Sequence, residues 1–340
     1  MTRRTMVLAM AMLGACGDDA AIDPQGSTTS DAHESSGVAT TESGEGDTTT
    51  SHGEEGTGSA ATDDPPVLDV ASADDGVEPG ECPCVGTGDG IYLLSDAAQL
   101  VTFDPETLAF ENLGTVECPT DGFPLALAVD RQGHALVSYF SETPPFAIET
   151  FSVALANPDV CEAVDLPLPE NHWLAGTGYA STSAAEPCDE LYLFSTPMVE
   201  AATGVIGRID HDSDEYVEVG AAPYYQAQLT GTGDGRLFGF AGTEGGELGS
   251  IASLVRFDLM GGNVLDEHVL DGLNADNGLG FAFWGGDVYF FTDGPHDTSI
   301  VTLLDYDESD GGGTTVVVDH TPVRVMGAGV STCAPYVPAG

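Results

Sequence analysis

Apolar runs that recur about every 50 residues constrain the fold of this chain more than any other feature. Five runs have the composition of buried strands bounded by turn residues: IYLL from Ile91, ALVSYF from Ala135, LYLF from Leu191, LFGF from Leu237 and VYFF from Val288. A strand ending before an aspartate, as at Phe103-Asp104, follows four of them. A third series of strands comes before the apolar runs along the chain, with GTGYAS at Gly176, GLGFAF at Gly278 and GAGVST at Gly327. A repeat of this length is typical of a β-propeller blade of four short strands.

The blades of a β-propeller form a closed ring, and the order of the three series predicts how this ring closes. The repeats begin with the second strand of a unit, at Ile91, and end with a first strand, from Gly327. The C-terminal strand should therefore complete the N-terminal blade, which leaves no long free edge for unwanted strand pairing. We predict an all-β fold over residues 82–340, a five-bladed β-propeller closed by its C-terminal strand.

Two copies of the peptide GTGDG, Gly86–Gly90 and Gly231–Gly235, fit this scheme. Their glycines permit the positive φ needed where an innermost strand turns back into the second strand. DRQG from Asp130 and WGGD from Trp284 occupy the same position in other units. A phosphate-binding loop is the competing interpretation, but neither a lysine nor a helix follows. The repeated peptide therefore predicts a repeated hairpin.

Hairpins such as FDPET, Phe103–Thr107, resemble those of bacterial kelch-like and quinoprotein-like propellers. The resemblance covers about 250 residues and implies the blade architecture, but it carries no catalytic residue across. The chain lacks a regular kelch diglycine and the tryptophan docking motif of quinoproteins. No pyrroloquinoline cofactor is therefore expected.

The first sixteen residues, MTRRTMVLAMAMLGAC, have the layout of an export signal. Their apolar run, Met6–Leu13, is too short to span a bilayer. The four residues Leu13–Cys16 resemble the lipobox of bacterial lipoproteins, and this resemblance implies that Cys16 becomes the lipidated mature N-terminus. An ordinary cleaved signal and a twin-arginine signal are the alternatives. We expect an exported protein anchored in the bacterial cell envelope, at the outer membrane or the cell surface.

Residues 17–81 contain no lysine, arginine or aromatic residue, but 17 acidic residues and 17 serines and threonines. Such a segment cannot bury enough apolar surface to offset its ordering entropy, so we predict a disordered acidic tether. The whole chain has a formal charge of −49 and no lysine. A nucleic-acid partner is excluded because its phosphates would be repelled.

Six cysteines remain after Cys16, and an even number in an exported chain indicates three disulfides. They are Cys82, Cys84, Cys118, Cys161, Cys188 and Cys333. We expect Cys161 to pair with Cys188, because both should face the same side of neighbouring blades. Cys333 should pair with Cys82 or Cys84, and Cys118 with the other. A zinc site is the alternative, but two CxxC pairs and histidine partners are missing.

The loops that enter the innermost strands should converge at one face of the ring, where propellers usually bind ligands. They would bring together Asp121, His172, Trp173, Tyr224, Tyr225, Asp276, Asn277 and Arg324. Two carboxylates, aromatic platforms and one arginine would suit a sugar or another small polar ligand. The alternative is that any propeller carries polar loops at this face. In a glycosidase, Asp121 and Asp276 would be the acid and base candidates.

The hairpin DHDSDE places Asp210, Asp212 and Asp214 at alternate positions, like the start of a calcium-binding EF-hand loop. Glu215 then stands where that loop requires glycine, and Ala221 where it requires the bidentate glutamate. A solvated turn is the favoured interpretation, with calcium the one cofactor left open.

These observations predict a membrane-anchored lipoprotein that displays a propeller as a binding or scaffold module for a protein, glycan or small molecule. A carbohydrate-active or other hydrolytic enzyme is the alternative, and the sequence favours the module.

Overall fold

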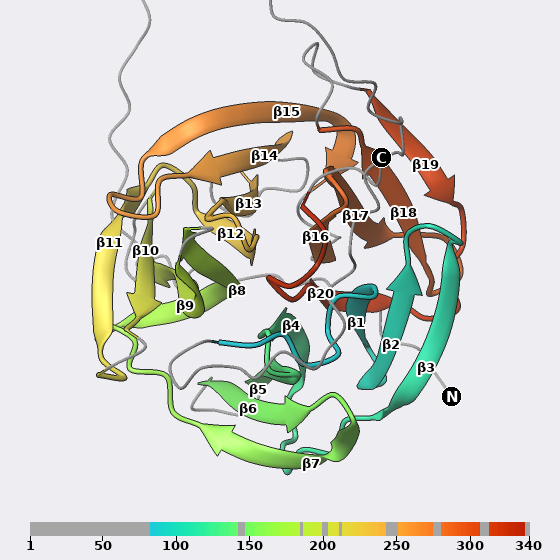
Figure 1. The fold of residues 1–340 in the computed structure, drawn as a ribbon, viewed down its shortest axis with the longest axis horizontal. Coiled ribbons are helices and arrows are strands. Elements are labelled where there is room, and N and C mark those ends of the chain that lie inside the picture. Colours follow the sequence, from blue (N-terminus) through green and yellow to red (C-terminus); the bar gives the residue numbers. More distant parts are fainter. Residues whose placement is uncertain are drawn as a thin grey trace, which may run out of the picture. The chain divides into compact units, whose positions relative to one another are not determined.

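The computed structural model describes residues 82–141, 147–183, 186–198, 203–210, 213–242, 251–274, 280–306 and 313–336. Every regular element among them is a β-strand, and the twenty strands form five four-stranded sheets around one axis (Figure 1). The predicted all-β, five-bladed propeller is therefore confirmed. The predicted signal peptide, its Cys16 and the acidic tether lie outside the described residues. The described residues include no helix that could span a membrane.

Each blade is an antiparallel sheet whose four strands lie in order from the axis of the ring to its rim. In that order, the first blade contains β20 (Val325–Gly329), β1 (Ile91–Ser95), β2 (Gln99–Asp104) and β3 (Ala109–Thr115). The second contains β4 (Phe123–Val129), β5 (His134–Ser141), β6 (Ala147–Ala154) and β7 (Asn157–Val164). The third contains β8 (His172–Ser183), β9 (Glu186–Pro197), β10 (Gly204–Ile209) and β11 (Tyr216–Ala222). The fourth contains β12 (Gln226–Gly231), β13 (Leu237–Gly242), β14 (Ile251–Phe257) and β15 (Val264–Asn274). The fifth contains β16 (Gly280–Trp284), β17 (Asp287–Asp293), β18 (Ser299–Leu304) and β19 (Thr314–Val318).

The first blade is built from both ends of the domain, as the phase of the repeats predicts. Strand β20 pairs with β1 in antiparallel register, with Gly329 opposite Tyr92 and Gly327 opposite Leu94. The other four blades each use four strands that are consecutive in the sequence. The pairing of β20 with β1 is therefore the single seam that closes the ring.

Glycines in the innermost strands let neighbouring blades approach closely at the axis. A Cβ at Gly176 would lie 2.2 Å from the carbonyl oxygen of Ala227, on the next blade. A Cβ at Gly327 would lie 2.8 Å from the backbone nitrogen of Leu127. Real Cβ atoms do not come this close to a backbone, so these positions accept no side chain. The glycine-rich third series of the sequence therefore marks the tight central ring.

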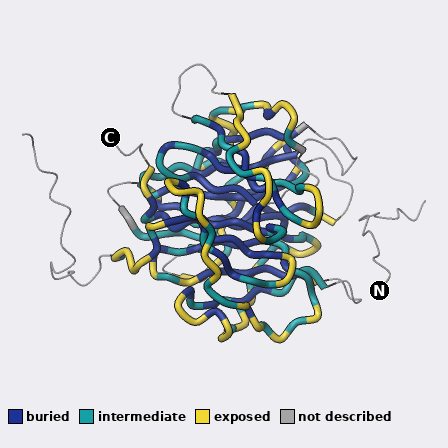
Figure 2. Tube along the Cα trace, turned by 90° about the vertical axis from the view of Figure 1, so that its right-hand side faces the viewer, coloured by how far each residue is buried: buried dark blue, intermediate teal, exposed yellow. Residues whose placement is uncertain are grey.

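Apolar side chains fill the spaces between successive blades, so the core is a ring of interfaces. Phe238 on β13 stacks on Phe283 on β16, with ring centroids 5.0 Å apart and planes 5° apart. Phe103 on β2 meets Phe291 on β17 edge to face at 5.7 Å. Figure 2 shows buried chain running through the middle of the domain, with exposed residues gathered in the loops.

Three disulfides join the six cysteines, and one part of the predicted pairing is correct. Cys333 pairs with Cys84, as one of the two expected alternatives. The predicted Cys161–Cys188 pair and the predicted pairing of Cys118 with the remaining N-terminal cysteine, Cys82, are both wrong. Cys161 bonds to Cys118, and Cys188 bonds to Cys82. Cys118 lies on the connection from β3 to β4, which packs against the β7 strand that carries Cys161. Three disulfides indicate an oxidising, extracytoplasmic compartment.

Candidate functional site

The ring has two faces, which we call the mouth and the base. The innermost strands begin at the mouth, and at the base they turn back into the second strands. At the base, the segment Val330–Tyr336 crosses from the first blade over the inner hairpins of others. Gly285 N donates to the carbonyl oxygen of Pro335 at 2.6 Å, and Arg236 Nη2 donates to that of Tyr336 at 2.9 Å. A ligand approaching the axis from the base therefore meets the chain's own C-terminal segment.

The two GTGDG peptides pack against this same C-terminal segment. A Cβ at Gly233 would lie 2.3 Å from the carbonyl oxygen of Thr332, and one at Gly88 would lie 3.1 Å from that of Cys333. The second copy forms the β12–β13 hairpin, as predicted, with Gly235 at φ +87°. The first copy is not a hairpin between consecutive strands. It leads the N-terminal segment into β1, whose inner neighbour comes from the other end of the chain.

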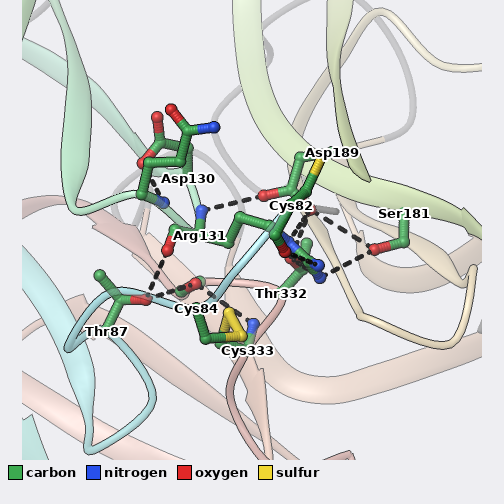
Figure 3. The surroundings of a disulfide bond; sticks show 11 residues. Cys82, Cys84, Thr87, Asp130, Arg131, Ser181, Asp189, Thr332 and Cys333 are labelled. Carbon is green, nitrogen blue, oxygen red and sulfur yellow. Dashed lines mark hydrogen bonds and ion pairs between the residues drawn. A yellow bond between two sulfur atoms is a disulfide. The ribbon is translucent and has the colours of Figure 1, made fainter. Parts of the chain in front are cut away.

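Arg131, in the β4–β5 hairpin, is the hub of a buried polar cluster at the base (Figure 3). Its Nε lies 3.1 Å from Asp189 Oδ1, and its backbone nitrogen donates to Asp189 Oδ2 at 2.9 Å. Its Nη1 donates to the carbonyl oxygen of Cys82 at 2.9 Å, and its Nη2 to Thr332 Oγ1 at 3.0 Å. Sequence reasoning missed this cluster, because its members come from four separate parts of the chain.

Burial raises the pKa of the Asp189 carboxyl, while the hydrogen bond from Thr332 and the charge of Arg131 act in the opposite direction. The side chains of Arg131 and Asp189 are each only 6% exposed. An ion pair so deeply buried is tolerated when its remaining hydrogen-bonding groups are also satisfied. The cluster is satisfied by the chain itself, so it is structural, and the candidate ligand site lies at the mouth.

At the mouth, the structure brings three of the predicted residues together at the start of β8 and β12. The Trp173 and Tyr225 rings have centroids 6.2 Å apart and planes inclined by 50°. His172, next to Trp173, has its Nδ1 3.0 Å from Ser195 Oγ. All three side chains are half-buried. We call His172, Trp173 and Tyr225 the ledge.

The ledge is supported from beneath by two consecutive hydroxyls at the end of β9. Ser195 and Thr196 are both fully buried. Ser195 Oγ bonds to the ring of His172, and Thr196 Oγ1 donates to the carbonyl oxygen of Tyr225 at 2.5 Å. Buried hydrogen bonds of this kind fix the orientation of groups that face solvent. Sequence reasoning missed both residues, because a serine and a threonine within a strand carry no recognisable signal.

Two other predicted mouth residues serve the fold. Tyr224 is 3% exposed and packs edge to face on Phe257 at 6.2 Å, and burial raises its pKa. Arg324 forms two hydrogen bonds of 2.9 Å with the carboxylate of Asp293. These bonds raise the pKa of the Arg324 guanidinium. Tyr224 is thus part of the core, and the Arg324 guanidinium is engaged by Asp293.

Of the two predicted acid and base candidates, the structure describes Asp121. Asp121 is exposed on the connection that leads into β4. Asp276 and Asn277 lie outside the described residues. A second aromatic pair that sequence reasoning missed, Phe123 and Phe140, lies beside Asp121 at the mouth end of β4 and β5, with ring centroids 5.4 Å apart. Its position at the start of an innermost strand, like that of Trp173, was the available signal.

The basic residues of the domain are nearly all neutralised. The chain has no lysine, and the domain has five arginines. Four form ion pairs, which are Arg131–Asp189, Arg208–Glu190, Arg236–Asp234 and Arg324–Asp293. The fifth, Arg256, lies on β14 opposite Phe238, and its Nε is buried. An anionic ligand at the mouth would find acidic surroundings and no unpaired arginine, so the arrangement favours neutral or positively charged ligands.

The proposed calcium ligands form a turn among the described residues. Asp210 Oδ1 accepts hydrogen bonds from the backbone nitrogen and the hydroxyl of Ser213, and Asp212 lies outside the described part of the chain. The backbone nitrogen of Asp214 donates to the carbonyl oxygen of Asp210 at 2.9 Å. Within the described ranges, no group of three or more metal-ligating side chains is close enough to hold a metal ion.

No known protein family matches the sequence, and no curated protein is similar to it in sequence. Solved structures with a similar arrangement include a protein of unknown function from Dyadobacter fermentans, with TM-score 0.44 and 11% identity over 66% of this chain and 73% of that one. An α-L-arabinofuranosidase from Clostridium thermocellum matches with TM-score 0.42 and 11% identity over 65% and 82%. The β-propeller domain of the trilobed protease from Pyrococcus furiosus matches with TM-score 0.33 and 9% identity over 59% and 58%. Similarity at these identities concerns the fold alone.

Proposed function

We propose that this protein is an exported lipoprotein that presents its propeller as a binding module, with a small polar ligand bound on the ledge at the mouth. The observation that carries the proposal is the pair of fully buried hydroxyls, Ser195 and Thr196, that holds His172 and Tyr225 in place. Half-buried aromatic rings fixed by buried polar groups are a common design of small-ligand sites.

The chemistry of the ledge narrows the ligand class. Inclined Trp173 and Tyr225 rings offer apolar faces for the C–H face of a sugar or for an organic cation. His172 adds a ring nitrogen that can take part in hydrogen bonding. Since the arginine at the mouth is paired with Asp293, the ligand is neutral or positively charged, and a sugar is the first class to test.

The lipid anchor belongs to the same proposal. It is supported by the lipobox resemblance at Leu13–Cys16 and by the three disulfides, which fit an oxidising compartment. The tether, residues 17–81, would hold the domain off an outer membrane or cell surface. Replacement of Cys16 by alanine should release the protein into the soluble fraction, and an unchanged membrane fraction would contradict the anchor.

Binding is favoured over hydrolysis because the Asp121 carboxylate, the acid–base candidate that the structure describes, is exposed on the connection into β4. Glycosidases hold two carboxylates roughly 5 to 10 Å apart around the scissile bond. Calcium enters the proposal as a counterion for the acidic surface and has no role in the ledge.

The experiment is a glycan and metabolite binding screen on the full-length chain, followed by titration of any hit. Trp173→Ala and Ser195→Ala should each weaken binding by about tenfold or more. Trp284→Phe, at the β16–β17 turn on the base, is the matched control and should leave affinity unchanged. A hit that binds both ledge variants as tightly as the native chain would contradict the assignment of the ledge.

A further inference from the structure

Each of the two disulfides at the base has one cysteine directly next to a member of the Arg131 cluster. Cys188 precedes Asp189, and Cys333 follows Thr332. Cys82 contributes its own carbonyl oxygen to Arg131 Nη1. Thr332 Oγ1 donates a hydrogen bond of 2.5 Å to Asp189 Oδ1, so the residue next to Cys333 is bonded to the residue next to Cys188 (Figure 3).

These bridges hold both ends of the domain on one arginine. The N-terminal segment is held by Cys82 and by Val85, whose backbone nitrogen donates to the carbonyl oxygen of Arg131 at 2.9 Å. The C-terminal segment is held by Thr332. Thr87 Oγ1 and Ser331 Oγ, 2.9 Å apart, join the two segments directly beside the hub. Arg131 belongs to the second blade, and neither terminal segment contributes a strand to that blade. The two segments are therefore held there by these contacts and not by strand pairing.

We propose that the base of the propeller is a redox latch, in which Cys82–Cys188 and Cys84–Cys333 assemble the Arg131 cluster and hold the β20–β1 seam closed. The inference goes beyond the proposed ligand site and does not depend on it. When both bridges are reduced, the two terminal segments leave Arg131 and the seam opens.

The opening is local because of how the blades are built. Blades two to five each take four consecutive strands, whereas the first takes its innermost strand from the other end of the chain. Loss of β20 therefore removes one strand from the first blade together with its packing against β4 and β16, and leaves the strands within each other blade paired. The third disulfide, Cys118–Cys161, ties the connection after β3 to β7 and bridges no residue of β20 or β1.

The chemistry of the latch is thiol–disulfide exchange. Each bridge forms when two cysteine thiols give up two protons and two electrons to an external disulfide, which is reduced to its two thiols. A chain held in a reducing compartment keeps an open seam, and the ring closes after transfer to an oxidising one. The fold thereby senses that export is complete.

Hydrogen exchange measured by mass spectrometry on the full-length chain tests the latch. Reduction with dithiothreitol should accelerate amide exchange in β20 and β1 by about tenfold or more, while exchange in β13 and β14 of the fourth blade stays unchanged. The Cys118→Ser/Cys161→Ser variant is the matched control and should keep native exchange at the seam. Unchanged exchange at β20 and β1 after reduction would overturn the latch, and so would faster exchange in all five blades.

A second measurement tests the coupling through Arg131. In the oxidised chain, Thr332→Val should accelerate exchange at the seam, because it removes the hydroxyl shared by Arg131 and Asp189. In the reduced chain the same substitution should have no further effect, since Thr332 has already left the hub. An equal acceleration in the oxidised and the reduced chain would show that Thr332 stabilises the seam independently of the disulfides, which would contradict the latch. Arg131→Met should likewise accelerate exchange at the seam in the oxidised chain only. If Arg131→Met does not fold, the result for Thr332→Val alone decides whether the coupling exists.

Discussion

Thr332 Oγ1 donates a hydrogen bond of 2.5 Å to Asp189 Oδ1, across 143 positions of the sequence. The bond connects the residues that follow the closing strand β20 to strand β9 of the third blade. Arg131 of the second blade binds both partners. The base is thus fixed by both ends of the domain, and the opposite face, with its aromatic ledge, is the face that we propose for a ligand.

Gly176→Ala should destabilise the domain by about 1–3 kcal/mol, because its Cβ would lie 2.2 Å from a backbone oxygen that cannot move freely. Gly313→Ala is the matched control, since no atom lies within 4 Å of its added Cβ. The control should change the free energy of unfolding by less than about 0.5 kcal/mol. Urea denaturation of both variants checks the difference, and equal stabilities would contradict the tight central ring.

Tyr139→Phe should preserve or raise stability at neutral pH, because the Tyr139 hydroxyl is buried and has no hydrogen-bond partner among the described residues. Burial raises the pKa of Tyr139 from 10.0 to about 12. The folded state therefore keeps this proton longer than the unfolded state, so the native chain loses stability as the pH rises from 10 through 12.

The Tyr139→Phe variant should lack this part of the alkaline loss, which amounts to about 2–3 kcal/mol when the phenol is fully titrated. Unfolding free energies measured between neutral pH and pH 12 provide the comparison. Parallel curves for the native and variant proteins would mean that the Tyr139 phenol titrates normally.

Salt should raise the melting temperature of the protein. Residues 82–340 carry 39 acidic residues and five arginines, so like charges repel across the surface and screening reduces that repulsion. We expect a rise of about 2–4 °C for each kcal/mol of repulsion removed. Melting curves recorded at increasing sodium chloride concentration test this, and a flat series would show that the acidic surface is not strained.

Calcium should act only through its charge. Calcium chloride and magnesium chloride at equal concentration should therefore shift the melting temperature equally. A larger shift with calcium would reveal a specific site, and the Asp210 hairpin would be the first place to look.

The ring could be predicted from the sequence because its repeats report local geometry. Apolar runs mark buried strands, and the G-x-G of GTGYAS marks contact with the next blade. The order of these strand types along the chain then predicts the order of strands in each blade and the closure of the ring. Boundaries were predicted less well, since the strand predicted to end at Phe103 continues to Asp104. The disulfide pairing failed at Cys161 and Cys188 because it depends on where connections between blades run, which no repeat records.

The candidate site could be predicted in part for the same reason. Trp173 and Tyr225 begin equivalent innermost strands, so the blade order alone places them at one face. The supports of the ledge could not be found, because Ser195 and Thr196 gain their role from a register that only the folded sheet defines. Arg131 was missed likewise, since its partners lie 58 and 201 positions away.

Peptide mapping of the unreduced protein tests the closed ring most directly. Because Cys82 and Cys84 reach across the base, we expect digestion to release Cys84 linked to Cys333, Cys82 linked to Cys188, and Cys118 linked to Cys161. Cys333 recovered as a free thiol would contradict the closed ring, and a Cys161–Cys188 peptide would contradict the arrangement of the base on which the mouth assignment rests.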